Sequence, residues 1–273
     1  MLQPHFLKTP QGNIFIQSFV PENPNGDVVL FIPPFAEEMN KSRRMMALLG
    51  RSLSTKGTLM VIPDLYGTGD SEGDFSDANW TIWQNNLELL VQKLQEDGVK
   101  TLSLVGLRMG CLLINDIISK YQIKVKDVIF WKPVTSGKQM INQFLRLRVA
   151  NSMMDGLKET TTSLREKLAS ESELEVAGYG LNAGLVSDLD EQVMANKSFD
   201  DAINWHWFEV LAANSQSIPI ASTKLIEGLS GRGIKTNLQQ FVGENFWANQ
   251  EIAEVPELIS ATSRILCEAV DGR

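Results

Sequence analysis

Histidine is scarce in this chain, with two residues, His5 and His206, among 273. Two are too few for a histidine-rich metal site, and they leave two candidates for any catalysis that depends on histidine. Cysteine is equally scarce, and Cys111 and Cys267 alone cannot build a disulfide framework or a four-cysteine zinc site. We therefore expect neither a metal ion nor a cofactor.

Basic residues are fewer than acidic ones, 25 Lys and Arg against 33 Asp and Glu, for a net charge of -8. This balance argues against a nucleic-acid partner, because phosphate binding needs a basic surface. Long apolar runs are also missing: none approaches the ~18–20 residues that a membrane span needs. The first residues show no basic and then apolar signal-peptide pattern. We expect a soluble protein of a reducing compartment, by default the cytoplasm.

Short apolar runs alternate with amphipathic segments through the first half of the chain. Such runs are typical of strands buried on both faces of a parallel sheet, and they lie at 28–32, 59–62, 102–105 and 128–131. Helical spacing of apolar residues marks the segments between them, at 41–56, 83–94 and 109–121. The alternation predicts stacked βαβ units and a doubly wound, mostly parallel α/β sheet.

The ends of the chain extend this sheet to about eight strands. An antiparallel hairpin is predicted over the first 20 residues, around Pro10-Gln11-Gly12-Asn13. Strands at 203–210 and 234–242 and helices at 217–229 and 252–268 are expected at the other end.

The strand rhythm is lost from 135 to 200. Helices are expected at 138–154 and 157–170, followed by a loop with glycines at 178, 180 and 184. We interpret 135–200 as a helical lid inserted between two parts of one core, 1–134 and 201–273.

The segment Gly106-Leu107-Arg108-Met109-Gly110 follows the strand at 102–105 and precedes a helix. Glycines two residues before and after a central residue, on a tight strand-to-helix turn, are the spacing of the nucleophile elbow of α/β-hydrolases. Two further segments resemble that fold. The loop from Asp64 to Gly73 resembles a glycine-rich loop that follows its fourth strand, and Pro33-Pro34-Phe35 lies where it places an oxyanion-hole amide.

Blocks spread over nearly the whole chain resemble the type 2 hydrolase-like proteins of bacterial exosortase A and exopolysaccharide gene clusters. The most specific block is residues 33–44, and the others are 106–110, 131–137, 175–179 and Phe246-Trp247. The resemblance implies an α/β-hydrolase fold in a cell that makes exopolysaccharide.

The elbow carries the wrong residue for covalent catalysis, because Arg108 stays protonated and cannot attack a carbonyl. The catalytic histidine of this fold follows the last strand, where the chain has Gly243-Glu244-Asn245-Phe246-Trp247. His206 lies one strand earlier and is interpreted as a packed strand residue. The sequence therefore lacks a Ser-His-Asp triad and does not decide whether the protein is an enzyme.

Arg108 presents five N–H donors at the site where an acyl group reacts in this fold, which favours a bound carboxylate, phosphate or acidic sugar. Alternatively, Arg108 pairs internally with Glu37, Glu38 or Glu209 and plugs the site. The other residues expected to bind a ligand lie in the same segments; they are Phe35, Met109, Phe246 and Trp247.

Two functions stay open. In the first, a degenerate hydrolase binds a small anionic, acyl or glycan ligand, or a partner, in exopolysaccharide metabolism. In the second, an esterase- or thioesterase-like enzyme lets Glu37, Glu38 or Asp70 activate water without a covalent intermediate. Cys111 is expected to be a buried structural residue, and Ser71 has no evident histidine partner.

A basic and apolar segment, 132–149, stands out in an acidic chain. It contains Lys132, Lys138, Arg146 and Arg148 and no acidic residue. The simplest interpretation is a lid helix; the alternatives are contact with an anionic glycan, a membrane surface or a partner protein.

Overall fold

The computed structural model describes residues 1–273 except 122, 155, 157, 214–216 and 268–273. Its main sheet has eight strands in the order β1-β2-β4-β3-β5-β6-β9-β10. The strands are β1 (Leu2–Lys8), β2 (Asn13–Phe19), β3 (Asp27–Ile32), β4 (Leu59–Pro63), β5 (Thr101–Leu107), β6 (Asp127–Trp131), β9 (Asn204–Leu211) and β10 (Thr236–Val242). β1 and β2 form the predicted antiparallel hairpin, β2 also runs antiparallel to β4, and the other pairs are parallel.

Alternate residues of the central strands enter two separate cores. In β3, Val28, Leu30 and Ile32 pack into the core on one face, and Val29 and Phe31 into the core on the other. This burial on both faces explains why the predicted strands read as continuous apolar runs. The mostly parallel, doubly wound sheet of eight strands is confirmed.

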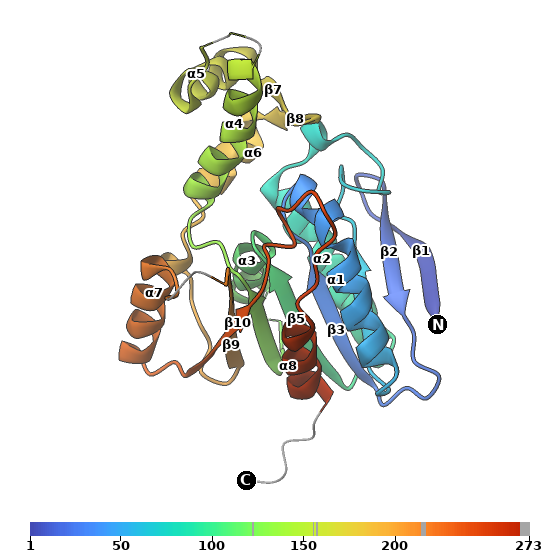
Figure 1. Cartoon of the computed structure of the whole chain (residues 1–273). Helices are drawn as coiled ribbons and strands as arrows, with labels where there is room; N and C mark the ends of the chain where they lie inside the picture. The colour runs from blue at the N-terminus through green and yellow to red at the C-terminus, as the bar shows by residue number, and fades with distance from the viewer. Residues whose placement is uncertain (122, 155, 157, 214–216, 268–273) are drawn as a thin grey trace.

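Helices cover both faces of this sheet (Figure 1). α1 (Glu37–Ser54) and α8 (Pro256–Cys267) contribute to one core; α2 (Trp80–Glu96), α3 (Gly110–Tyr121) and α7 (Ile220–Gly231) contribute to the other. Asn79 caps α2 through its Oδ1, which accepts the backbone N–H of Ile82 at 2.8 Å. Two single-turn 3-10 helices, η1 (Phe75–Asp77) and η2 (Met194–Asn196), lie in connections.

Helix boundaries differ from the predicted ones at several ends. α1 begins at Glu37 rather than residue 41, since Ala36 turns the chain with φ of 50° and without a side-chain cap. α7 begins at Ile220 rather than 217, after Pro219, and α8 begins at Pro256 rather than 252. Residues 268 and 157, at the ends of two predicted helices, lie outside the described residues.

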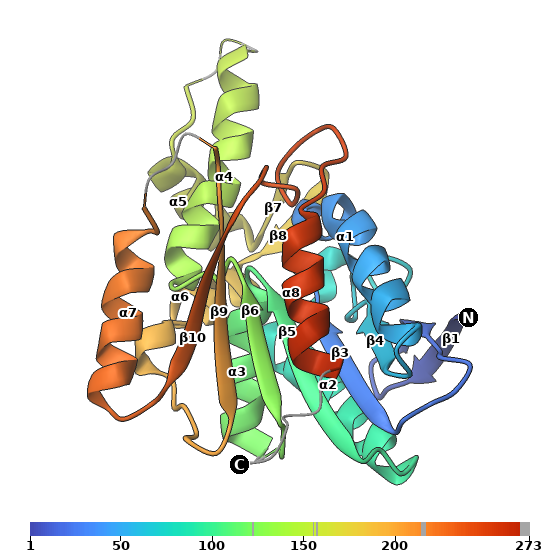
Figure 2. The ribbon, with the colours of Figure 1, turned by 60° about the horizontal axis from the view of Figure 1, so that its bottom comes forward.

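The segment between β6 and β9 is not purely helical, which corrects the prediction. α4 (Gly137–Met154), α5 (Thr161–Glu171) and α6 (Ala183–Asp190) are joined by an antiparallel hairpin of β7 (Glu173–Val176) and β8 (Tyr179–Asn182). The hairpin and α6 occupy the stretch expected to be a glycine loop. Figure 1 shows this group of elements beyond one end of the main sheet, and in Figure 2 the far part of α4 projects past the strands.

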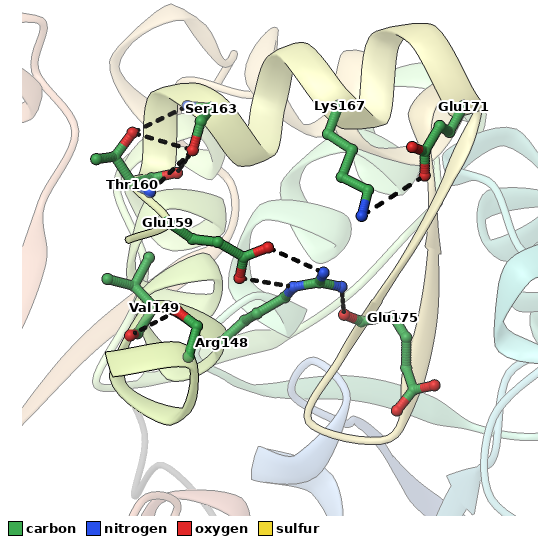
Figure 3. Close-up of polar contacts among 9 residues, drawn as sticks. Arg148, Val149, Glu159, Thr160, Ser163, Lys167, Glu171 and Glu175 are labelled. Atoms are coloured by element: carbon green, nitrogen blue, oxygen red, sulfur yellow. Dashed lines mark hydrogen bonds and ion pairs between the residues drawn. The ribbon is translucent and has the colours of Figure 1, made fainter. Parts of the chain in front are cut away.

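Arg148 ties this group together (Figure 3). Its guanidinium donates to both carboxylate oxygens of Glu159, each at 3.1 Å, and to the backbone oxygen of Glu175 at 2.7 Å. Bidentate pairs of this kind are stronger than single ionic contacts. One side chain thus links α4, the start of α5 and β7.

Candidate functional site

The turn after β5 has the backbone of a nucleophile elbow. Arg108 has φ of 54°, a left-handed conformation that costs a non-glycine residue about 1–3 kcal/mol. A Cβ at Gly110 would lie 2.3 Å from the backbone oxygen of Ile32, and one at Gly106 would lie 2.7 Å from Ile114. Both glycines are therefore required for the close approach of β3, β5 and α3.

Arg108 is paired with one of the three carboxylates that the sequence offered. Its Nε–H donates to Glu38 Oε1 at 3.1 Å, and the side chains of Arg108 and Glu38 are 14% and 24% exposed. Its guanidinium also lies 5.6 Å from the ring centre of Trp247, within the range of a cation–π contact. Among the described residues, no hydrogen bond uses the two Nη groups.

Glu38 is incompletely satisfied by this contact. Burial raises its pKa above the ordinary value, and the charge and hydrogen bond of Arg108 oppose that rise. Oε2 of Glu38 is buried and, among the described residues, has no hydrogen-bond partner. Glu37 differs, since it is 40% exposed and pairs with Lys41 at 2.9 Å.

A cavity of about 300 Å³ lies beside the pair. Its lining combines charged groups with apolar residues from the core and from α4: Phe35, Glu37, Glu38, Lys41, Arg108, Met140, Gln143, Phe144, Leu147, Trp247 and Ala248. The Arg108–Glu38 contact therefore does not fill the site completely. Aromatic contacts join α4 and β8 to the core nearby: the ring centres of Phe35 and Phe144 lie 5.2 Å apart, and those of Phe75 and Tyr179 lie 5.1 Å apart.

Five of the candidate residues lie on this one lining: Arg108, Phe35, Trp247, Glu37 and Glu38. Two other residues expected to bind a ligand, Met109 and Phe246, lie in the core instead, with 2% and 1% exposure. Neither is among the described residues that line this cavity.

Glu209 does not reach Arg108. Instead, its Oε2 accepts from Lys132 Nζ at 2.8 Å, while its Oε1 accepts from Trp207 Nε1 at 2.9 Å and from Ser222 Oγ at 2.6 Å. The sequence analysis missed this buried Lys132–Glu209 pair, because the two residues lie 77 positions apart and share no motif.

The remaining candidates are structural. His206 Nε2 lies 3.4 Å from Asp127 Oδ1, near the start of β9, whereas Arg108 follows the far end of β5. The Ser71 hydroxyl donates to the backbone oxygen of Asp64 and accepts the N–H of Phe15. The Cys111 side chain is fully buried, and this burial raises the pKa of its thiol well above the ordinary value, which disfavours the nucleophilic thiolate.

Asp70 takes part in the same loop, where its backbone N–H donates to Asp64 Oδ2 at 2.9 Å. Among the described residues, no group of three His, Cys, Asp or Glu side chains is placed to hold a metal ion. None of the helices in the described part of the chain is long and apolar enough to span a membrane.

No model of a known protein family matches this chain, and no curated protein matches it in sequence. Several solved structures are similar to it in fold. Est1E from Butyrivibrio proteoclasticus, in its complex with ferulic acid, has a TM-score of 0.69 at 16% identity over 96% of both chains. The thioesterase domain from the curacin biosynthetic pathway has a TM-score of 0.59 at 16% identity, over 98% of this chain and 100% of that one.

XC6422 from Xanthomonas campestris, an α/β serine hydrolase without a lid, has a TM-score of 0.62 at 12% identity, over 98% of this chain and 96% of that one. Together these structures confirm the α/β-hydrolase fold predicted from the elbow. At such identities they show the fold alone.

Proposed function

We propose that this protein is a degenerate hydrolase that binds an amphipathic anion in the cavity beside Arg108. The observation that carries the proposal is a guanidinium with both Nη groups uncommitted among the described residues, on the wall of a largely apolar cavity. A carboxylate or phosphate would accept from the Nη groups. An acyl or other apolar portion would contact Phe144, Leu147 and Met140.

The absence of a triad is part of this proposal. Arg108 stands at the elbow, the loop after β10 contains Phe246 and Trp247 instead of a histidine, and His206 is bonded to Asp127. Esters of p-nitrophenol and acyl thioesters are therefore expected to show no turnover above the background rate.

Octanoate is a suitable probe for the binding site, because its carboxylate and short alkyl chain match the two parts of the lining. Isothermal titration calorimetry is expected to show saturable binding that Arg108→Met weakens at least tenfold, as expected for a lost charge-assisted hydrogen bond. Arg51→Met is the matched control. Arg51 is exposed, about 20 Å along α1 from Glu37 at 1.5 Å per residue. Equal octanoate affinity in wild type and Arg108→Met would refute the proposal.

A second function, water activation by Glu38, has one observation in its favour. A buried carboxylate with a raised pKa and an unbonded oxygen is a stronger base than an exposed one. Turnover of an ester or thioester by wild type that is lost in Glu38→Gln and kept in Glu37→Gln would establish this enzyme and overturn the binding proposal.

We also place the protein in exopolysaccharide metabolism and in the cytoplasm, on the strength of the sequence resemblance and composition described above.

The segment 132–149 is proposed as a second contact surface, for a partner protein or a membrane. Its charge is lower than its sequence suggests, since Lys132 and Arg148 have carboxylate partners. Lys138, Arg146 and Leu147 are exposed.

A further inference from the structure

A second cation follows the neighbouring strand at the same edge of the sheet. Lys132 comes directly after β6, as Arg108 comes after β5, and both have positive φ, 44° and 54°. The Arg108 N–H donates to the oxygen of Trp131 at 3.0 Å, and the Lys132 N–H donates to the oxygen of Phe208 at 2.7 Å. Sheet hydrogen bonds thus fix two strained, cationic residues side by side. Strained residues gather at functional sites.

A cavity of about 540 Å³ separates these two side chains from α7 and the loop after β10. Its lining includes Arg108, Lys132, Asn245 and Trp247. Arg108 and Trp247 also line the apolar cavity under α4. Arg108 therefore borders both cavities. The other cation of the first cavity, Lys41, is bonded to Glu37 at 2.9 Å and to the backbone oxygen of Ala248 at 3.0 Å, and the other cation of the second cavity is Lys132.

Lys132 is held by an ion pair, which uses one of the N–H donors of its ammonium group. Glu209, which is 0% exposed, accepts one N–H of the ammonium, and its other oxygen is already bonded to Trp207 and Ser222. An ammonium has three N–H donors, and no other acceptor for Lys132 Nζ is found among the described residues. The remaining donors are available to a ligand in the cavity that Lys132 lines.

We propose that the ligand's head group is doubly charged, like a phosphate monoester, and that it bridges Arg108 and Lys132. This inference rests on the proposed binding of an amphipathic anion. A carboxylate has one charge and two oxygens, which a single guanidinium satisfies. A phosphate monoester has a charge of about −1.5 to −2 at pH 7 and three terminal oxygens, which suit two cations and the nearby amide of Asn245. The alkyl portion then lies under α4.

Octyl phosphate and octanoate test this, because they share an apolar chain length and differ in the head group. Calorimetry at pH 8, below the micelle concentration of either compound, is expected to show octyl phosphate binding at least tenfold more tightly, the effect of one added charge-assisted contact. Lys132→Met/Glu209→Gln removes the cation and its buried counter-charge together. This double variant is expected to bind both compounds equally and to keep wild-type affinity for octanoate, which also shows that it is folded.

A measurement on wild type alone keeps the test decisive if the double variant does not fold. The ratio of the two affinities is expected to fall toward one between pH 8 and pH 5, as the phosphate, with a second pKa of about 6, loses a charge. A ratio near one at pH 8, a constant ratio across pH, or a preference that survives in the double variant would overturn the inference. Failure of both compounds to bind, or undiminished binding of both to Arg108→Met, would instead refute the proposed function.

Discussion

The contact between Arg108 and Glu38 makes a quantitative prediction about stability. Among the described residues, Arg108 is the only group that lowers the pKa of Glu38 by a direct hydrogen bond, and Arg108→Met removes it. The carboxylate then stays buried without a partner, a situation that costs about 1–3 kcal/mol. Because Glu38 is 24% exposed, we expect the lower half of that range, about 1–2 kcal/mol, or a Tm lower by roughly 2–6 °C.

The sign of the pH dependence follows from the raised pKa of Glu38 in the folded protein. Folding favours the protonated form, so stability is lost as pH rises above the unfolded value of 4.5. Without Arg108 the pKa rises further and the loss is larger. The difference between Arg108→Met and wild type is therefore expected at pH 8 and should vanish at pH 4.5 and below.

Urea unfolding of wild type, Arg108→Met, Glu38→Gln and the double variant measures the coupling between the two side chains. We expect a coupling of about 1 kcal/mol or more at pH 8, and a double variant about as stable as wild type, since a neutral pair leaves no buried charge. Additivity within about 0.5 kcal/mol at pH 8 would show that the ion pair contributes nothing, and the argument would fail.

Two further predictions concern the scaffold. Gly110→Ala should destabilise the fold by about 3 kcal/mol or more, because the new Cβ would lie 2.3 Å from a backbone oxygen of β3. The control is Gly228→Ala in α7, where nothing lies within 4 Å of the new Cβ. In the same urea assay this control should be as stable as wild type or slightly more stable. Arg148→Met should speed limited proteolysis between α4 and α5. Lys167→Met, which breaks an exposed 3.9 Å contact with Glu171 (Figure 3) and leaves the hydrogen bonds of Arg148 in place, should not. Equal stability of the two glycine variants, or equal cleavage of the two lid variants, would contradict these readings.

The sheet could be predicted because the signal for each strand lies within that strand's own residues. Each central strand buries both faces, so apolar runs such as Val28–Ile32 were sufficient to predict the strands. Gly106 and Gly110 marked the turn at which β3, β5 and α3 approach one another closely. The hairpin of β7 and β8 was missed because Gly178 and Gly180 were read as loop residues. The alternation of buried Leu174 and Val176 with exposed neighbours was a usable strand signal, although a short one.

The candidate site was predictable only in part, because pairing between distant residues leaves no trace in sequence. Nothing in the sequence distinguishes Glu38 from Glu37 or Glu209 as the partner of Arg108; the choice is made by the start of α1 and by burial. Lys132 and Glu209 illustrate the same limit, since their contact depends on β6 and β9 being neighbours. Met109 and Phe246 were assigned to the lining because they neighbour Arg108 and Trp247 in sequence, but both side chains are buried in the core.

The left-handed backbone at the elbow also has a consequence for attempts to convert this protein into an esterase. Serine at position 108 would stand on a turn of the right shape, but the loop after β10, which carries the catalytic histidine in this fold, has Trp247 and no histidine. A histidine introduced there would remove the ring against which the arginine now packs and would still need an orienting carboxylate. Glu209, the nearest buried acid on β9, is already bonded to three side chains. Building a Ser-His-acid triad at this turn would thus require changes on several loops at this edge of the sheet, not the exchange of a single residue.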